Sequence, residues 1–375
     1  MNSTPSWLRR HPVLALVGIN VAIFIAVILL VEIAMRLYLP YNPSYYMSVG
    51  GNSREVVYPF GIIKINSDGF PDDEFDMSKR HHVGYFGDSV TYGVGAGHGY
   101  RFSDLLAESY PEYAHMNFSG IALSVSRATI ERHVALAEKF DLDVALYFFN
   151  LNDIVPDAAV SKKRRRADPE VSRGRWLFWR TFFTVDRLRG KSYLYTWVRT
   201  LAKNYLEAQG IGFHGYLAYE LHPQREHGIL VETARRISLF RSELAKKGVE
   251  FILVLLPYEM QISQQAAETY ADHGISWENG FIEGSTQRII IDSLDPEVRY
   301  VDLLPAFIDV GHPEQSRADN GLGQYFVYDR GDKLDWNHPN RLGHRVIADY
   351  LGRVDFLRRD RSLETADADP SNRGR

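Results

Sequence analysis

The chain has 375 residues, of which 45% are hydrophobic and 24% charged, the profile of a globular protein rather than of a disordered or fibrous one. Its formal net charge of −4 excludes a global positive field that would attract nucleic acid. Because the chain has no cysteine, disulfides, thiolate metal sites and a cysteine nucleophile are excluded too. Oxygen and imidazole groups must therefore supply any chemistry.

An apolar run near the N-terminus predicts a membrane anchor. Val13 to Val31 has no charged residue and is long enough to cross a bilayer core of about 30 Å. A cleaved signal peptide is the alternative, but its apolar region usually spans only about 7 to 15 residues before a small-residue cleavage site. We therefore predict a transmembrane helix over residues 13–35.

The charges around this run predict its orientation. Arg9 and Arg10 precede it, so the positive-inside rule leaves residues 1–12 in the cytoplasm and sends the remainder across. The sequence thus predicts a single-pass protein of the inner (cytoplasmic) membrane, with its main domain in the periplasm or outside the cell. Residues 36–82 are interpreted as a linker and pre-domain segment because Tyr38 to Tyr46 is rich in Tyr, Pro, Asn and Ser.

The pattern of residues 83–357 predicts one α/β domain. The tail that follows, 358–375, is polar and charged and is expected to be disordered. Short apolar runs alternate with amphipathic stretches, a pattern typical of a mostly parallel sheet covered by helices, here a three-layer α/β/α sandwich. The expected strands are 83–86, one ending near Phe118, 144–149, 249–256 and 300–303. The expected helices are 100–110, 124–140 with Ser124 as its cap, and 230–247 ending at Gly248.

The alternation breaks down over residues 155–228, which we interpret as an insertion. It contains a basic run, Lys162 to Arg166, and then an aromatic-rich stretch. One interpretation is a lid, a substrate platform, or a basic surface that contacts anionic lipid headgroups. We favour a small subdomain with its own aromatic core, because aromatic clusters usually bury their large apolar area.

The strongest chemical signal is Gly87-Asp88-Ser89, placed where a buried strand must turn into a helix. In open α/β sheets, ligands bind outside the carboxyl ends of the strands, and a glycine permits the tight turn that would leave Ser89 exposed there. A serine hydroxyl is a weak nucleophile by itself. It needs a general base within hydrogen-bond reach, and that base needs an orienting partner.

Asp335-Trp336-Asn337-His338 offers such a base near the C-terminal end. The carboxylate of Asp335 is close enough in the chain to accept from His338 Nδ1, which would turn Nε2 toward Ser89. Pro339 and Asn340 then lead into an amphipathic helix that is expected to support the histidine loop.

Together these segments resemble the SGNH hydrolase family, also called GDSL esterases, over about residues 83–351. The resemblance implies a flavodoxin-like fold with Ser89, His338 and Asp335 as the catalytic triad. It also implies an oxyanion hole made by the backbone N–H groups of Ser89 and Gly120 and the side chain of Asn152. One position departs from the pattern, because the asparagine block commonly begins with glycine and this chain has Asn150.

The resemblance implies a serine esterase that acts on acyl esters, in particular acetyl esters, of carbohydrates or other small molecules, and the predicted anchor makes it extracytoplasmic. No metal or organic cofactor is implied, and the oligomeric state is left open. Three alternatives stay open as well: an O-acetyltransferase that modifies an exopolysaccharide, a lipid acyl hydrolase, and a non-catalytic carbohydrate-binding protein.

Two polar clusters are interpreted as structural. His81 and His82 are adjacent, so their side chains point apart and make a poor metal pair. Asp72, Asp73, Glu74 and Asp76 form an acidic run that lacks a calcium-loop pattern and is predicted to be solvated surface.

Overall fold

The computed structural model describes residues 12–38, 55–58, 61–121, 123–154, 192–208, 221–224, 226–262, 266–268, 285–310, 325–328 and 334–354. The chain divides into two compact units, one made of Met1–Gly51 and Asp168–Leu206, the other of Asn52–Ala167 and Glu207–Arg375. The predicted tail, 358–375, and most of the predicted insertion lie outside the described residues. The predicted domain boundaries stay predictions.

The second unit is built on a parallel five-stranded sheet with the order β4-β3-β5-β6-β7. The strands are β3 (His81–Gly87), β4 (Tyr113–Asn117), β5 (Val144–Phe149), β6 (Glu250–Leu255) and β7 (Arg299–Asp302). Every residue of the central strand β5 is buried, as expected for a parallel strand covered on both faces. The five predicted strands are confirmed.

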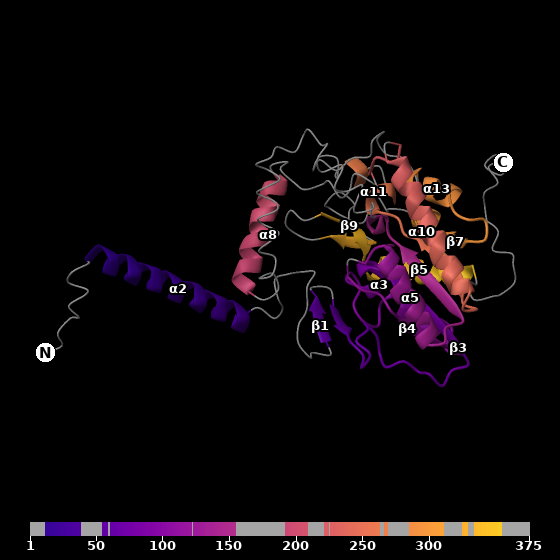
Figure 1. Cartoon of the computed structure of the whole chain (residues 1–375), viewed down its shortest axis with the longest axis horizontal. Coiled ribbons are helices and arrows are strands. Elements are labelled where there is room, and N and C mark those ends of the chain that lie inside the picture. The colour runs from indigo at the N-terminus through magenta and orange to yellow at the C-terminus, as the bar shows by residue number, and fades with distance from the viewer. Residues whose placement is uncertain are drawn as a thin grey trace. The chain divides into compact units, whose positions relative to one another are not determined.

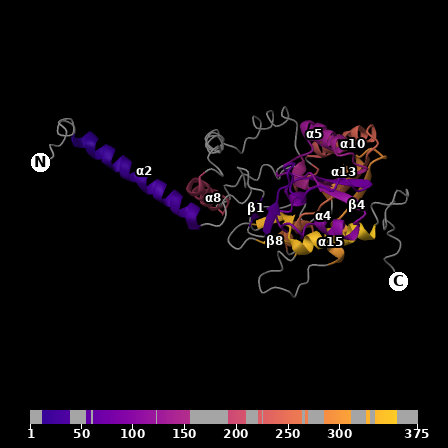
Figure 2. The ribbon, with the colours of Figure 1, turned by 90° about the horizontal axis from the view of Figure 1, so that it is seen from below.

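Helices cover both faces of this sheet (Figure 1). One face carries α5 (Arg127–Lys139), α10 (His227–Ala245) and α13 (Ser285–Asp292). The other face carries α4 (Phe102–Ser109), α14 (Leu304–Asp309) and α15 (Arg341–Arg353). Figure 2 shows α5 and α10 on one side of the sheet and α4 and α15 on the other.

The strands supply both cores by alternation. In β5, the side chains of Leu146 and Phe148 join the core under α4 and α15, whereas those of Tyr147 and Phe149 join the core under α5 and α10. Two apolar layers on opposite faces of one sheet confirm the predicted three-layer α/β/α sandwich.

The predicted helices are present, but their boundaries differ from the prediction by a few residues. The cap of α5 is Ser126, whose Oγ accepts from the Thr129 N–H, so the choice of Ser124 was wrong by two residues. Helix α10 begins and ends slightly earlier than predicted, and Gly248 follows it with a φ of 77°, a left-handed conformation that favours glycine.

Two small antiparallel pairs were not predicted. Strands β1 (Glu55–Tyr58) and β2 (Gly61–Lys64) form a pair within the residues interpreted as linker and pre-domain segment. Strands β8 (Phe326–Tyr328) and β9 (Leu334–Pro339) form the other. His338 therefore lies in a strand, which corrects the interpretation of its segment as a loop.

The first unit contains α2 (Pro12–Tyr38) and nearly all of α8 (Tyr193–Ala208). By length and composition α2 is able to cross a membrane, a test that a signal sequence near the N-terminus also passes. None of its residues is buried within the structure, so it is not the core helix of a globular unit.

Candidate active site

The topology leaves an open edge where the predicted site residues meet. Counted along the chain within the sheet, the strand order is 2-1-3-4-5, so the connections from β3 and β4 depart to opposite sides of β3. In sheets of this kind, ligands bind outside the carboxyl ends of the strands at this switch point. Ser89 follows β3, Gly120 follows β4, and Asn152 follows β5.

The turn that carries Ser89 is specified by its neighbours. Asp88 caps the short helix α3 (Ser89–Tyr92), and its carboxylate accepts from the Val90 N–H at 2.9 Å. A Cβ at Gly87 would lie 2.9 Å from the Phe148 carbonyl oxygen, so only glycine lets the turn pass β5 this closely. These contacts direct Ser89 to the end of the sheet.

His338 lies directly against this serine. Its Nε2 is 2.8 Å from Ser89 Oγ, although 249 residues separate the two along the chain. Both side chains are buried, with exposed fractions of 5% for Ser89 and 3% for His338. The expectation of an exposed Ser89 was therefore wrong. Strand β9 covers the turn closely enough that a Cβ at Gly95 would collide with the Pro339 carbonyl oxygen.

The predicted third member of the triad is only partly described. Asp335 lies in β9, three residues before His338, but its side chain is outside the part that the structure describes. Its role as the orienting carboxylate stays a prediction.

Asp88 contacts Ser89, although the sequence interpretation gave it no role in the site. Its Oδ2 lies 3.3 Å from Ser89 Oγ and competes with His338 for the one hydroxyl proton, but the 2.8 Å contact favours the histidine. Burial raises the pKa of Asp88, whereas the Val90 N–H, the charge of His338 and an Asn152 hydrogen bond lower it. An aspartate just before a short helix is a recognisable capping signal.

The predicted oxyanion donors lie around the same turn. The Gly120 N–H donates to the Gly87 carbonyl at 3.2 Å, so in this conformation the amide is already engaged. Asn152 donates from its side chain to Asp88, and its amide group has a second N–H. The Ser89 N–H opens α3 and has no acceptor within that helix. Gly120 and Asn152 thus contact Gly87 and Asp88, the two residues just before Ser89.

Asn150, the position that departs from the family pattern, links the two halves of the site. It is fully buried, and its Nδ2 donates to the Asn337 carbonyl at 3.4 Å, just before His338. Its own N–H donates to Asp153 Oδ2 at 3.2 Å. A glycine here could not make the contact with β9.

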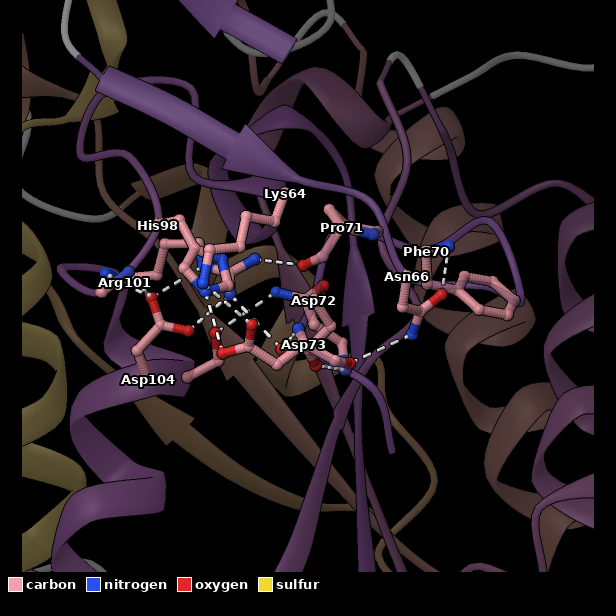
Figure 3. A network of polar contacts seen from close by, with 12 residues as sticks. Lys64, Asn66, Phe70, Pro71, Asp72, Asp73, His98, Arg101 and Asp104 are labelled. Atoms are coloured by element: carbon pink, nitrogen blue, oxygen red, sulfur yellow. Dashed lines mark hydrogen bonds and ion pairs between the residues drawn. The ribbon is translucent and has the colours of Figure 1, made fainter. Parts of the chain in front are cut away.

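A buried ionic network centred on Arg101 packs against Gly93, the residue that ends the short helix begun by Ser89, and Figure 3 shows Arg101 among its acidic partners Asp72 and Asp104. The Arg101 side chain has no exposed surface and pairs with Asp104 and, at 3.4 Å, with Asp72; it also donates to the Pro71 carbonyl. Its aliphatic stem crosses Gly93, where an added Cβ would collide with it. The link from Arg101 to Asp72 was missed because the two residues lie 29 positions apart in the sequence.

The network corrects one interpretation of the acidic run. The Asp72 side chain is only 16% exposed, so predicting it as solvated surface was wrong, whereas Asp73 at 69% and Asp76 at 54% are at the surface. Burial raises the pKa of Asp72 from its ordinary value of 3.8 to about 7, although the Arg101 charge opposes the rise.

Asp72 connects this network to the end of β4 and, through it, to α3. Its Oδ2 accepts from the Asn117 N–H at 2.8 Å, and Asn117 Nδ2 donates to the Thr91 carbonyl in α3 at 2.8 Å. The end of β4, which leads to Gly120, is thereby tied to the helix that begins with Ser89.

No protein-family model matches the chain, and neither does any curated protein. Solved structures do. One is described as a lipolytic protein of the G-D-S-L family from Desulfitobacterium hafniense DCB-2, with 13% identity over 73% of this chain and 99% of that one and a TM-score of 0.33. A G-D-S-L lipolytic protein from Veillonella parvula DSM 2008 has 12% identity over 74% and 99%, with a TM-score of 0.35.

A third, described as an acylhydrolase from Bacteroides fragilis NCTC 9343, has 12% identity over 77% of this chain and 92% of that one, with a TM-score of 0.30. The family named for the first two structures is the one that the motifs of this chain resemble. At these identities and TM-scores, what those proteins do does not transfer to this chain.

Proposed function

We propose that the protein is a membrane-anchored serine esterase that hydrolyses acyl esters, with acetyl esters of carbohydrates or other small molecules as its substrate class. The 2.8 Å contact between Ser89 Oγ and His338 Nε2, at the switch point of the sheet, is the observation that supports this function. A hydroxyl and an imidazole in hydrogen-bond contact form the minimal unit that makes a serine nucleophilic.

In the first step, Ser89 Oγ attacks the ester carbonyl while His338 Nε2 takes the hydroxyl proton. The new C–O bond places a negative charge on the former carbonyl oxygen, and the Ser89 N–H and the second amide N–H of Asn152 are the groups to stabilise it. The Gly120 N–H joins them once it exchanges the Gly87 carbonyl for the oxyanion. His338 then protonates the leaving alcohol as the ester C–O bond breaks.

In the second step, water attacks the acyl-enzyme and His338 takes its proton. The tetrahedral intermediate collapses, the acid leaves, and the proton returns to Ser89 Oγ. Asp335 would hold the imidazole with its Nδ1 proton turned away from the serine and stabilise the imidazolium that forms in each step.

The N-terminal helix supports the proposed location. Helix α2 contains the uncharged run Val13 to Val31, and Arg9 and Arg10 precede it, so the active site would face the periplasm or the cell exterior. There it would meet ester groups on extracytoplasmic glycans and on small molecules that enter from outside.

A fluorophosphonate probe tests the nucleophile. It forms a P–O bond with an activated serine and releases fluoride, which raises the intact mass by one phosphonyl group. We expect the full-length wild-type protein in detergent to be labelled and Ser89→Ala to stay unlabelled. Equal labelling of both proteins would assign the reactivity to another serine, and no labelling of a folded wild type would contradict an esterase.

The acceptor is tested next, with an acetylated sugar as acyl donor and a second, unacetylated oligosaccharide added or withheld. An esterase releases acetate at the same rate in both reactions, and the oligosaccharide keeps its mass. Acetylation of the oligosaccharide would instead assign the protein to the acetyltransferases.

A further inference from the structure

Within the first unit, the end of the proposed anchor is fastened to helix α8. Glu32 Oε2 accepts from Ser192 Oγ at 2.8 Å and from the Leu194 N–H at 2.9 Å. Its Oε1 accepts from the Tyr193 N–H at 3.0 Å and from Arg36 Nε at 2.7 Å. These four hydrogen bonds occupy the carboxylate fully, and we call them the Glu32 clamp.

The clamp lies at a defined depth if α2 spans a bilayer. Val13 to Val31 rises roughly 27 Å along a helix axis, close to the thickness of a hydrocarbon core. Glu32 is the first charged residue after this run, so it sits at the boundary between acyl chains and headgroups. A carboxylate there is costly unless it is paired, and the clamp supplies that pairing.

The start of α8 must then lie at the same boundary, because Tyr193 and Leu194 contact Glu32 directly. Figure 1 shows the start of α8 beside the C-terminal end of α2. The Arg36 guanidinium also lies 5.3 Å from the centroid of the Tyr193 ring. Tyrosine is enriched at the interface of a membrane, and an arginine near the end of a spanning helix extends its guanidinium to that interface.

From this start, α8 presents an apolar face. Trp197, Val198 and Leu201 are 47%, 50% and 48% exposed and share one side of the helix. On the other side Thr196 and Arg199 are buried, at 1% and 6%. The polar side chains are thus covered and the large apolar ones are not, the reverse of a helix that faces water.

We propose that α8 is an interfacial helix whose Trp197, Val198 and Leu201 face lies on the outer leaflet of the bilayer that α2 spans. The inference depends on the proposed anchoring by α2 and adds a second contact with the same membrane. The partner is the lipid surface because the Glu32 clamp fixes the start of α8 at the end of the exposed apolar run of α2, and α8 exposes large apolar side chains from there. Amphipathic helices with tryptophan and leucine on one face bind at this depth.

Because the chain has no cysteine, single cysteines can be labelled without background. We would label Val198→Cys and Leu201→Cys with nitrobenzoxadiazole in the full chain, in phosphatidylethanolamine–phosphatidylglycerol vesicles that contain doxyl-labelled lipid. Leu239→Cys in α10, 41% exposed, is the matched control on the second unit, and Ile23→Cys reports on α2 itself.

We expect the labels at positions 198, 201 and 23 to be quenched and the label at 239 to stay bright. Quenching at 23 without quenching at 198 and 201 would overturn the interfacial role of α8 and leave the anchor in place. A bright label at 23 would overturn the anchor itself. Equal quenching at 239 would show that the contact is not specific to α8.

Glu32→Leu tests the clamp, because it removes all four hydrogen bonds and keeps the segment apolar. We expect the label at 201 to lose its quenching while the label at 23 keeps it. Glu32→Gln retains one acceptor oxygen and should lose only part of the quenching. Unchanged quenching at 201 in Glu32→Leu would show that the clamp does not set the position of α8.

Discussion

The two halves of the candidate active site are held in place in different ways. Ser89 sits on a turn specified by residues beside it in the sequence, Gly87 and Asp88, and anchored to the central sheet. His338 lies in β9, outside that sheet, and its support comes from distant segments. The Asn340 N–H donates to the Tyr325 carbonyl at 2.8 Å, and Arg341 Nε donates to the Ala96 carbonyl at 3.0 Å.

This difference predicts that the two halves fail differently when altered. Damage to the network behind the Ser89 turn should lower the stability of the protein, because Arg101 is fully buried in the second unit. Damage on the histidine side should reduce turnover and leave stability nearly unchanged, because β9 pairs only with the short strand β8 among the described strands.

The largest expected effect is on the histidine side. Asp335→Asn keeps the size of the side chain and removes the charge that would orient the imidazole, so kcat should fall by about 10⁴ with an unchanged unfolding midpoint. Steady-state hydrolysis of p-nitrophenyl acetate and thermal unfolding measure the two quantities. Activity near that of wild type would remove Asp335 from the triad.

On the nucleophile side, Arg101→Met should lower the free energy of unfolding by about 3–5 kcal/mol, because it leaves Asp72 and Asp104 buried without their partner. Arg127→Met is the matched control, since Arg127 is 86% exposed and pairs only with Glu131 among the described contacts. The control should change the free energy by less than about 1 kcal/mol. Equal urea midpoints for the two variants would contradict the structural role of Arg101.

A smaller loss of activity than for Asp335→Asn is expected when a proposed oxyanion donor is removed. Asn152→Ala should lower kcat by roughly 10²–10³, because a donor that strengthens in the transition state is lost. The unfolding midpoint should move little, because Asn152 is half-buried. Without its side chain, the Asp88 carboxylate still accepts a hydrogen bond from the Val90 N–H. A rise in KM alone, with kcat unchanged, would count against an oxyanion role.

The pH dependence of stability tests the protonation state of Asp72 in the network behind Ser89. The pKa of Asp72 rises from 3.8 to about 7 on folding, so the folded protein binds this proton more tightly than the unfolded chain. The stability that this group contributes is complete below about pH 4 and is lost as the pH rises through 7. Wild type should therefore become less stable relative to Asp72→Asn between pH 5 and 8. A constant difference in urea unfolding would show that Asp72 stays ionised throughout.

The smallest expected effect is at the link between the halves. Asn150→Ala removes the 3.4 Å hydrogen bond to the Asn337 carbonyl, and the loss of one neutral hydrogen bond predicts a fall in kcat of about two- to tenfold. The pH profile should keep its shape, because no titrating group is removed. An unchanged kcat would mean that β9 positions His338 without this contact.

Much of the fold was predictable because its strands are buried on both faces. Val144–Phe149 and the segment around Glu250–Leu255 are continuous apolar runs. A strand covered on both faces has such a run whichever helices cover it, so it can be recognised from the sequence. The predicted order of strands and helices follows from these runs. The β1–β2 pair was missed because short antiparallel strands at a surface have no comparable signal.

The site was predictable where it depends on local sequence. Gly87, Asp88 and Ser89 form a turn whose chemistry is contained in three adjacent residues. The buried pair of Arg101 and Asp72 was not predictable, since its members lie 29 residues apart and an aspartate in an acidic run ordinarily faces water. Ser89 was expected to be exposed because nothing in its own segment indicates that β9 covers it.

By itself, then, the sequence determined the parallel sheet, the turn that carries Ser89 and the apolar helix near the N-terminus, because each depends on periodicity or on adjacent residues. Only the tertiary structure decided that His338 reaches Ser89, that Arg101 and Asp72 meet behind the turn, and that Glu32 holds the start of α8. Those contacts join segments that are distant in the chain, and their energy comes from burial and pairing that no local pattern records.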